Sequence, residues 1–387
     1  MGINLAGLAG WCMLPRFAEG RPGAAVHRIW AGEPSVVTVY AAAHRKCHHA
    51  GVGRRQPEEG AMKPRHAAPL PTLAALALLG LATACEPSKP TTPPSAGSPS
   101  FSATKSQPDD SAALVARVQQ VNQQLAAQGY NVAIEGIDFL TIGNGRPGIR
   151  IHQEGFRWVP NDPRRDADGT NITYLFDQSN GVTASGLSAG QTEAAVDAAL
   201  ATWAGDRALK KVTIIKRADS GADPTIFDFF FFCGASPCGG FGNPFLADIV
   251  DAGFYPRAFF EAVGGPGGGR GILAFSVSFI FVTASGVPTD INGDNYLDTA
   301  LNEVYFNNTF GDPANDRVGN PWGIDVALPG IDVQTVALHE NGHSLGLGHF
   351  GPPPTAVMNP VYGGIRHSPL PADDAGMNAL WRSWPNP

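Results

Sequence analysis

Residues 339–349, His-Glu-Asn-Gly-His-Ser-Leu-Gly-Leu-Gly-His, decide how the fold and chemistry of this chain are interpreted. If the segment begins as a helix, His339 and His343 lie one turn apart on one face, so both imidazole rings can bind one metal ion at about 2.0–2.1 Å. Glu340 lies beside the first ring and can orient a water molecule on that ion without binding the metal. The spacing therefore predicts a metal site with a general base next to it.

The end of the segment supplies a third ligand. Gly346 allows the chain to leave the helix in a left-handed backbone conformation that a β-carbon would disfavour. We expect this turn to bring His349 round to the other two rings. Three histidine ligands leave a fourth position for water, which is typical of a catalytic zinc ion and not of a structural one.

This segment resembles the active-site motif of the metzincin metallopeptidases, and a second motif narrows the resemblance. Met358 follows His349 by nine residues, within Ala-Val-Met-Asn-Pro-Val-Tyr at 356–362. The stretch looks like the Met-turn of the matrixin branch. The resemblance implies that Met358 forms an apolar floor beneath the ligands, and that Pro360 and Tyr362 line the pocket for the residue after the cleaved bond. The chain departs from the branch at Phe350, where matrixins usually have Ser, and it has no recognisable Cys-containing switch peptide.

By this resemblance, residues 166–387 form an α+β catalytic domain. Its expected parts are a twisted mixed sheet, an active-site helix, and a small C-terminal subdomain after the Met-turn. The hydrophobic pattern is compatible with this order. We expect strands at 172–176, 212–216, 225–232, 272–282 and 303–307, and helices that begin at the capping box 188–191, after Asp332, and at 371–381.

Residues 112–165 form a smaller region ahead of this domain. Apolar residues at helical spacing predict a helix over 112–129, and a strand is expected over 132–142. Both a propeptide-like subdomain and an integral part of the catalytic domain fit this pattern.

In metzincins the substrate docks as an additional strand along the sheet edge nearest the zinc ion, a form of β-augmentation. By the resemblance, this edge lies within residues 271–278. Matrixins often carry a structural zinc ion there, but the matching stretch, Leu-Ala-Phe-Ser at 273–276, has no histidine. We therefore expect no second zinc ion.

A second metal-binding pattern occurs ahead of the last predicted strand. Oxygen-bearing side chains alternate along the chain, as they do in calcium loops. They are Asp290, Asn292, Asp294 and Asp298. The stretch lacks the glycine and the final glutamate of an EF-hand, so calcium binding and an Asx-rich turn are both open interpretations.

Composition limits the classes of function. The chain has 387 residues, of which 43% are hydrophobic, enough for one large domain or two small ones. The formal net charge is −7, and residues 62–387 hold 20 basic and 30 acidic side chains. Because no basic patch offsets this excess, nucleic-acid binding is not expected. We expect a protein or peptide substrate instead.

An export signal lies inside the sequence. Residues 62–66 are basic, residues 73–82 are apolar but short for a membrane span, and Ala-Thr-Ala-Cys ends the segment at Cys85. Residues 62–85 resemble a bacterial lipoprotein signal, in which Cys85 would carry the lipid anchor; an ordinary secretory signal cut near Ala84 is the alternative. Because such signals are read at the N-terminus, we expect translation to start at Met62 and residues 1–61 to come from a misplaced start codon. A peptide from residues 2–55 in the mass spectrum of the secreted protein would contradict this.

Residues 86–111 are rich in Pro, Ser and Thr and are expected to form a flexible tether. Beyond Cys85, the remaining cysteines are Cys233 and Cys238. Two cysteines in an exported chain are expected to pair as a disulfide. The alternative is that one thiolate binds the zinc ion in a latent form.

Together, the residues and the resemblance imply a zinc-dependent endopeptidase that acts on extracellular proteins. Glu340 would take a proton from the attacking water and pass it to the leaving amine. Two other functions remain open, a catalytically silent surface binding module and a zinc hydrolase acting on a small amide or ester. The intact Glu340 argues against the first, and the expected edge strand argues against the second.

Overall fold

The computed structural model describes residues 110–385, apart from 144–145, 147, 153–154, 166–170, 234–244 and 315–318. Among these residues, eight strands form one mixed sheet in the order β2-β1-β7-β8-β6-β4-β5, with β3 paired to β8. Its strands are β1 (Val132–Thr141), β2 (Ile149–Arg150), β3 (Phe156–Arg157), β4 (Ile172–Phe176), β5 (Ile214–Lys216), β6 (Ile249–Tyr255), β7 (Ile272–Phe281) and β8 (Leu297–Asn307). A separate parallel pair consists of β9 (Trp322–Gly323) and β10 (Ile331–Asp332).

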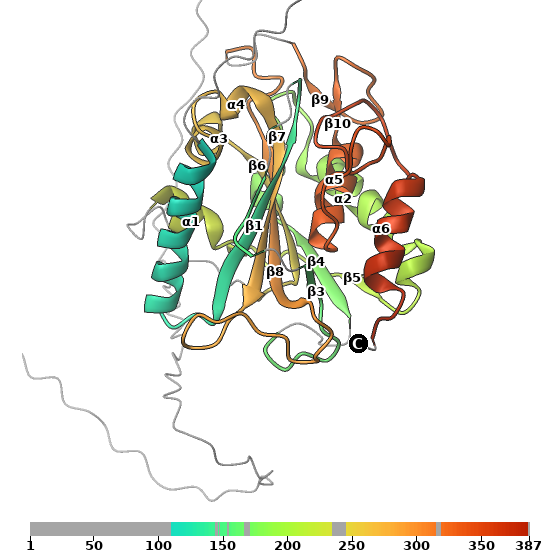
Figure 1. Ribbon diagram of the computed structural model, residues 1–387. Coiled ribbons are helices and arrows are strands. Elements are labelled where there is room, and N and C mark those ends of the chain that lie inside the picture. The colour runs from blue at the N-terminus through green and yellow to red at the C-terminus, as the bar shows by residue number, and fades with distance from the viewer. Residues whose placement is uncertain are drawn as a thin grey trace, which may run out of the picture. The chain divides into compact units, whose positions relative to one another are not determined.

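Helices cover both faces of the sheet (Figure 1). On one face lie α2 (Ala189–Ala204), α5 (Val333–Ser344) and α6 (Pro371–Trp381). On the other lie α1 (Asp110–Ala127), α3 (Arg257–Gly264) and the short α4 (Gly268–Gly271). Each face has its own apolar core, so the fold has three layers. The predicted α+β class is confirmed.

Several predicted elements are confirmed with their physical causes. Helix α2 begins with the capping box between Ser188 and Gln191, and its buried face includes Val196, Leu200 and Trp203. Helix α6 spans the predicted residues 371–381, with proline in its first turn. Strands β4, β5, β7 and β8 occur where strands were expected, and β8 begins six residues earlier, at Leu297.

The strand predicted over residues 225–232 is wrong. This segment forms a helical turn that continues into Phe229–Cys233. The N–H groups of Ile226 and Phe227 donate to the buried carboxylate of Glu303, at 2.7 and 3.0 Å, and not to a neighbouring strand. The run of phenylalanines indicated burial correctly, but burial on all sides does not distinguish a strand from a helical turn.

Strand β6 was not predicted, although it lies between β4 and β8. Asp251 and Gly253 interrupt its apolar run, and the register shifts between these two residues. Gly253 adopts φ +87°, and a β-carbon there would lie 2.5 Å from the carbonyl oxygen of Asn180. The glycine is thus required by a bulge and a close backbone contact.

Residues 271–278, where we expected the edge that a substrate joins, are not a free edge in this structure. Strand β1 pairs antiparallel with β7 along this whole stretch, and β2 continues the sheet beyond β1. Residues 112–165 thus contribute α1, β1, β2 and β3 to the fold, and all three strands belong to the main sheet.

Residues 1–109 lie outside the described part of the chain, and with them the predicted export signal, Cys85 and most of the predicted tether. Cys238 and the side chain of Cys233 also lie outside it, so the disulfide stays a prediction. In the described residues, no helix combines the length and apolarity needed to cross a membrane.

Candidate metal centre

The predicted metal site lies on helix α5, in the interior of the protein. The Asp332 carboxylate accepts the Thr335 N–H at 2.8 Å and so begins the helix. The indole N–H of Trp203 on α2 donates to the Leu338 carbonyl at 2.8 Å, which holds α5 against α2. His339, Glu340 and His343 are all buried on this helix.

The three predicted histidines converge. The Nε2 atoms of His339 and His343 lie 3.1 Å apart, and the Nε2 of His349 lies 3.3 Å from the first and 3.2 Å from the second. Tetrahedral bonds of about 2.0–2.1 Å to one zinc ion would separate such atoms by about 3.3 Å. The spacing of the three nitrogens therefore matches a zinc site.

The hydrogen bonds of the Nδ1 atoms leave the Nε2 atoms of the histidine rings free to bind a cation. The Nδ1 atoms of His339 and His343 lie 2.7 and 2.8 Å from the carbonyl oxygens of Val357 and Leu347, so both are donors. Burial lowers the pKa of both rings well below the usual range. His343 and His349 lower the pKa of His339 further, and His349 does the same to His343. Each ring is therefore neutral and turns an Nε2 lone pair toward the others. These lone pairs repel one another unless a metal ion lies between them.

Two glycines allow this geometry. Gly346 adopts φ +91°, and a β-carbon there would lie 3.0 Å from the carbonyl oxygen of Phe156. Gly342 lies between the ligands, where a β-carbon would be 2.4 Å from the Sδ of Met358. The fully buried Met358 thus packs directly against the metal-binding helix, in the place expected for a Met-turn.

Glu340 lies in the same helix between the two histidines. It is fully buried, and neither carboxylate oxygen has a hydrogen-bonding partner of normal geometry in the described part of the chain. Burial raises its pKa well above the usual range, and the charges of Asp138 and Asp251 add to this shift, while the nearby Leu140 N–H opposes it. An unpaired buried carboxylate beside a metal site is suited to bind water and to exchange protons with it.

Residues 360–362, here called the wall, follow Met358 and were expected to line the site. The hydroxyl of Tyr362 accepts the Asp332 N–H at 2.9 Å, which ties the wall to the start of α5. The Pro360 carbonyl accepts the Thr141 N–H at 3.1 Å, and the Tyr362 N–H donates to the Thr141 carbonyl at 2.8 Å. The wall therefore pairs with the end of β1.

Sequence reasoning missed Asp373, which positions the Met-turn. Its buried carboxylate accepts the N–H groups of Val357 and Met358, at 2.8 and 3.1 Å. Because the Val357 carbonyl in turn orients His339, Asp373 acts on the ligand through the backbone. The available signal was an aspartate in the first turn of the predicted closing helix.

Asp251 was missed as well. The Asn341 amide donates to its carboxylate at 3.1 Å, which joins β6 to the active-site helix. Complete burial raises the pKa of Asp251 to about 7. Asn341 appeared in the motif only as a spacer between Glu340 and Gly342.

The four residues of the predicted calcium loop do not converge on an empty site. Two of the carboxylates pair with buried or half-buried arginines, a third accepts backbone N–H groups, and the Asn292 amide nitrogen donates to Asp294, while the Asn292 side-chain oxygen has no hydrogen-bonding partner in the described residues. These contacts are Asp294 with Arg157, Asp298 with Arg164, Asp290 with the Asp294 N–H, and Asn292 with Asp294. The arginines supply the positive charge that the carboxylates require. This arrangement favours the Asx-rich turn, and calcium binding stays a prediction.

Within the described residues, metal-ligating side chains cluster at the triad and at one further place, Asp325, Asp332 and His367. There the Asp332 carboxylate lies 2.7 Å from Nε2 of His367, while that of Asp325 lies 3.6 Å from Nδ1. The two carboxylates lie nearest to opposite nitrogens of the His367 ring. His367 is a partner of the residue that caps α5.

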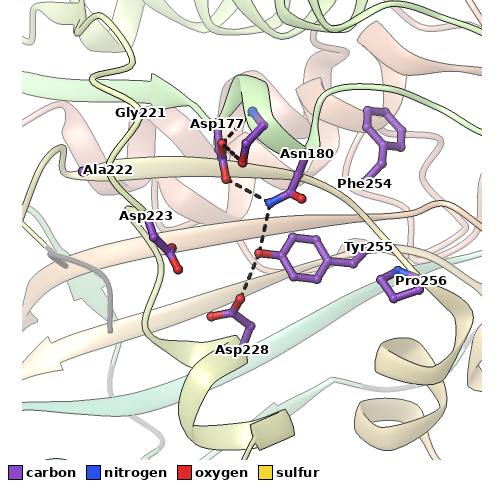
Figure 2. Close-up of a pocket in the computed structure, with 10 residues that line it drawn as sticks. Asp177, Asn180, Gly221, Ala222, Asp223, Asp228, Phe254, Tyr255 and Pro256 are labelled. Atoms are coloured by element: carbon purple, nitrogen blue, oxygen red, sulfur yellow. Dashed lines mark hydrogen bonds between the residues drawn. The ribbon is translucent and has the colours of Figure 1, made fainter. Parts of the chain in front are cut away.

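A cavity of 340 Å³ beside β6 contains none of the predicted site residues (Figure 2). Its acidic groups are engaged by neighbours. The Tyr255 hydroxyl donates to Asp228 at 3.0 Å, and the Asn180 amide donates to Asp177 at 2.9 Å. These bonds hold the wall of the cavity together and define no ligand.

Comparison with known proteins agrees with the geometry. The family model of the matrixin peptidases matches residues 283–382, which contain the three histidines, Glu340 and Met358. No curated protein matches the sequence significantly. The histidine triad, the mixed sheet and this match support a matrixin-like metzincin domain, and with it a zinc metallopeptidase.

Proposed function

We propose that this chain is an endopeptidase that hydrolyses peptide bonds in extracellular proteins with zinc as its cofactor. The observation that carries the proposal is the convergence of three histidine Nε2 atoms beside the unpaired carboxylate of Glu340. A structural zinc site would have no use for a buried carboxylate without a partner.

The residues of the site have three roles in peptide hydrolysis: metal binding, proton transfer and orientation of the histidine rings. A zinc ion held by His339, His343 and His349 would polarise the scissile carbonyl and lower the pKa of water toward neutrality. Glu340 accepts a proton from the attacking water and delivers it to the leaving amine, which its raised pKa favours. The carbonyls of Val357 and Leu347 hold two of the rings in the orientation that this requires.

The shape of the site favours a polypeptide over a small amide. Strand β7 and residues 360–362 both present backbone hydrogen-bonding groups to the chain that lies between them. Such an arrangement recognises an extended backbone, as in β-augmentation.

We also propose that the protein is exported and tethered to the cell envelope through a lipid on Cys85. The basic segment, the short apolar run and the small residues before Cys85 support this. The mass of the mature N-terminal peptide tests this proposal. A lipidated Cys85 is heavier, by its acyl chains, than the unmodified Cys85 that an ordinary secretory signal would leave after cleavage at Ala84.

Replacement of Glu340 tests the catalytic assignment. We expect Glu340→Gln to lower the rate of zinc-dependent cleavage of a peptide library by at least about a hundredfold, because it removes the general base. The zinc content should stay unchanged, since Glu340 is not a ligand. The matched control is Glu303→Gln, which makes the same change at another fully buried glutamate. Equal cleavage by Glu340→Gln and the parent would refute the role of Glu340.

A further inference from the structure

Strand β1 occupies the position that an extended substrate would take in this site. On one side it pairs antiparallel with β7, from Val132 with Phe281 to Thr141 with Ile272. On the other side, Thr141 forms a parallel bridge with Val361. The backbone of β1 is thus held between the strand and the wall that were expected to hold a substrate.

The side chains of β1 alternate between the two faces of the sheet. Leu140 is buried in the apolar cluster that contains Val357 and Tyr362, on the sheet face covered by α5. Phe139, next in the strand, points to the opposite face and packs edge-on against Phe275. By alternation, Asp138 shares the α5 face with Leu140.

We propose that β1 is a tethered occupant of the substrate groove, and that the described conformation is a latent form of the enzyme. A protein substrate can bind only after β1 has withdrawn from β7 and from residues 360–362. This inference rests on the proposed function, because it takes the groove to be the substrate site.

Contacts outside the groove hold β1 in place. The Asn122 side chain on α1 bonds both the N–H and the carbonyl of Ile134, at 2.7 and 3.0 Å. Strand β2 pairs with β1, and Arg150 on β2 binds the Asp138 carboxylate at 2.7 Å. A segment tethered in this way competes with free peptides at an effective concentration on the order of millimolar. External substrates are therefore excluded without any covalent lock.

Peptide binding tests the inference without relying on catalysis. The host is the zinc-loaded full chain with Glu340→Gln, and the probe is a fluorescent peptide with the sequence of residues 132–142. Leu140→Ala removes the side chain that anchors β1 in the apolar cluster, so we expect the probe to bind at least tenfold more tightly than to the host. The matched control is Leu209→Ala, an equally buried leucine of the same cluster on a 3-10 turn that packs against α6. This control should bind the probe no better than the host does.

Thr141→Pro is a second variant that leaves the side chain of Leu140 in place. It removes both the N–H and the hydroxyl that donate to the Pro360 carbonyl, and it should also raise the affinity for the probe. Unchanged affinity in both variants, with cooperative unfolding retained, overturns the inference.

Cleavage assays with Glu340 intact separate this inference from the proposed function. Faster zinc-dependent cleavage by Leu140→Ala than by the parent supports both. Tighter probe binding by Leu140→Ala without any cleavage would contradict the peptidase assignment and still support the tethered strand. Zinc-dependent cleavage at equal rates by parent and variant would support the peptidase assignment and contradict the tethered strand.

Discussion

At the scale of single residues, the contact between Gly342 and Met358 links the two motifs of the site. A β-carbon at position 342 would lie 2.4 Å from Sδ of Met358 and 3.2 Å from Cζ2 of Trp203. The helix can therefore carry both ligands over the Met-turn only if residue 342 has no side chain.

We expect Gly342→Ala to lower the free energy of unfolding by about 1–3 kcal/mol, because the new methyl group overpacks a buried contact. In a Met358→Ala background the same change should cost less, since the sulfur is gone. Urea unfolding of the four variants measures the coupling. An equal cost in both backgrounds would show that the Met358 contact is not the cause.

The catalytic residues could be predicted from sequence because they lie within eleven consecutive residues whose spacing follows helix geometry. Asp373 and Asp251 could not. They reach the site from α6 and β6, and each acts through a hydrogen bond to a residue far away in the sequence. An aspartate inside a strand or in the first turn of a helix does not indicate which donor on another element it will contact.

At the scale of elements, helix α5 depends on its first residues. The Asp332 carboxylate accepts both the N–H and the hydroxyl of Thr335, and it binds His367 at 2.7 Å. These bonds of the Asp332 carboxylate thus fix the residue at which the ligand-carrying helix begins.

We expect Asp332→Ala to lower the free energy of unfolding by about 1–2 kcal/mol through loss of the cap. Asp332→Asn keeps a side-chain oxygen that can accept the Thr335 N–H, so it should cost less. Chemical denaturation compares the two. Identical losses would mean that the cap contributes nothing and that the charge on Asp332 is what matters.

Elements with regular periodicity or a capping signal, such as α2 and α6, could be predicted from sequence. Strand β6 and the turn near Phe229 could not, because a bulge at Gly253 breaks the first pattern and all-round burial hides the second. The pairing of β1 with β7 could not be predicted from sequence either. Strand pairing between segments separated by more than a hundred residues leaves no local signal.

At the scale of the whole molecule, buried acids set the dependence of stability on pH. Complete burial raises the pKa of Glu303 to about 8, and the nearby charge of Asp228 adds to the shift. The folded state therefore binds this proton more tightly than the unfolded state does. Its contribution to stability is present at low pH and is lost as pH rises from about 4.5 toward 8. Asp251, with a pKa raised to about 7, acts in the same direction.

We expect the stability of the parent relative to Glu303→Gln to fall between pH 5 and 8 by on the order of 4 kcal/mol. Unfolding is measured in the presence of a chelator, so that metal release does not add its own pH dependence. A difference that stays constant over this range would show that Glu303 does not take up a proton on folding.

The central claim is that three buried imidazoles bind one zinc ion. Anomalous scattering at the zinc absorption edge, from crystals of the zinc-loaded chain, tests it most directly. We expect one strong peak at about 2.0–2.1 Å from Nε2 of His339, His343 and His349. Absence of a peak at that point, or three rings turned so that they cannot share an ion, would contradict the account.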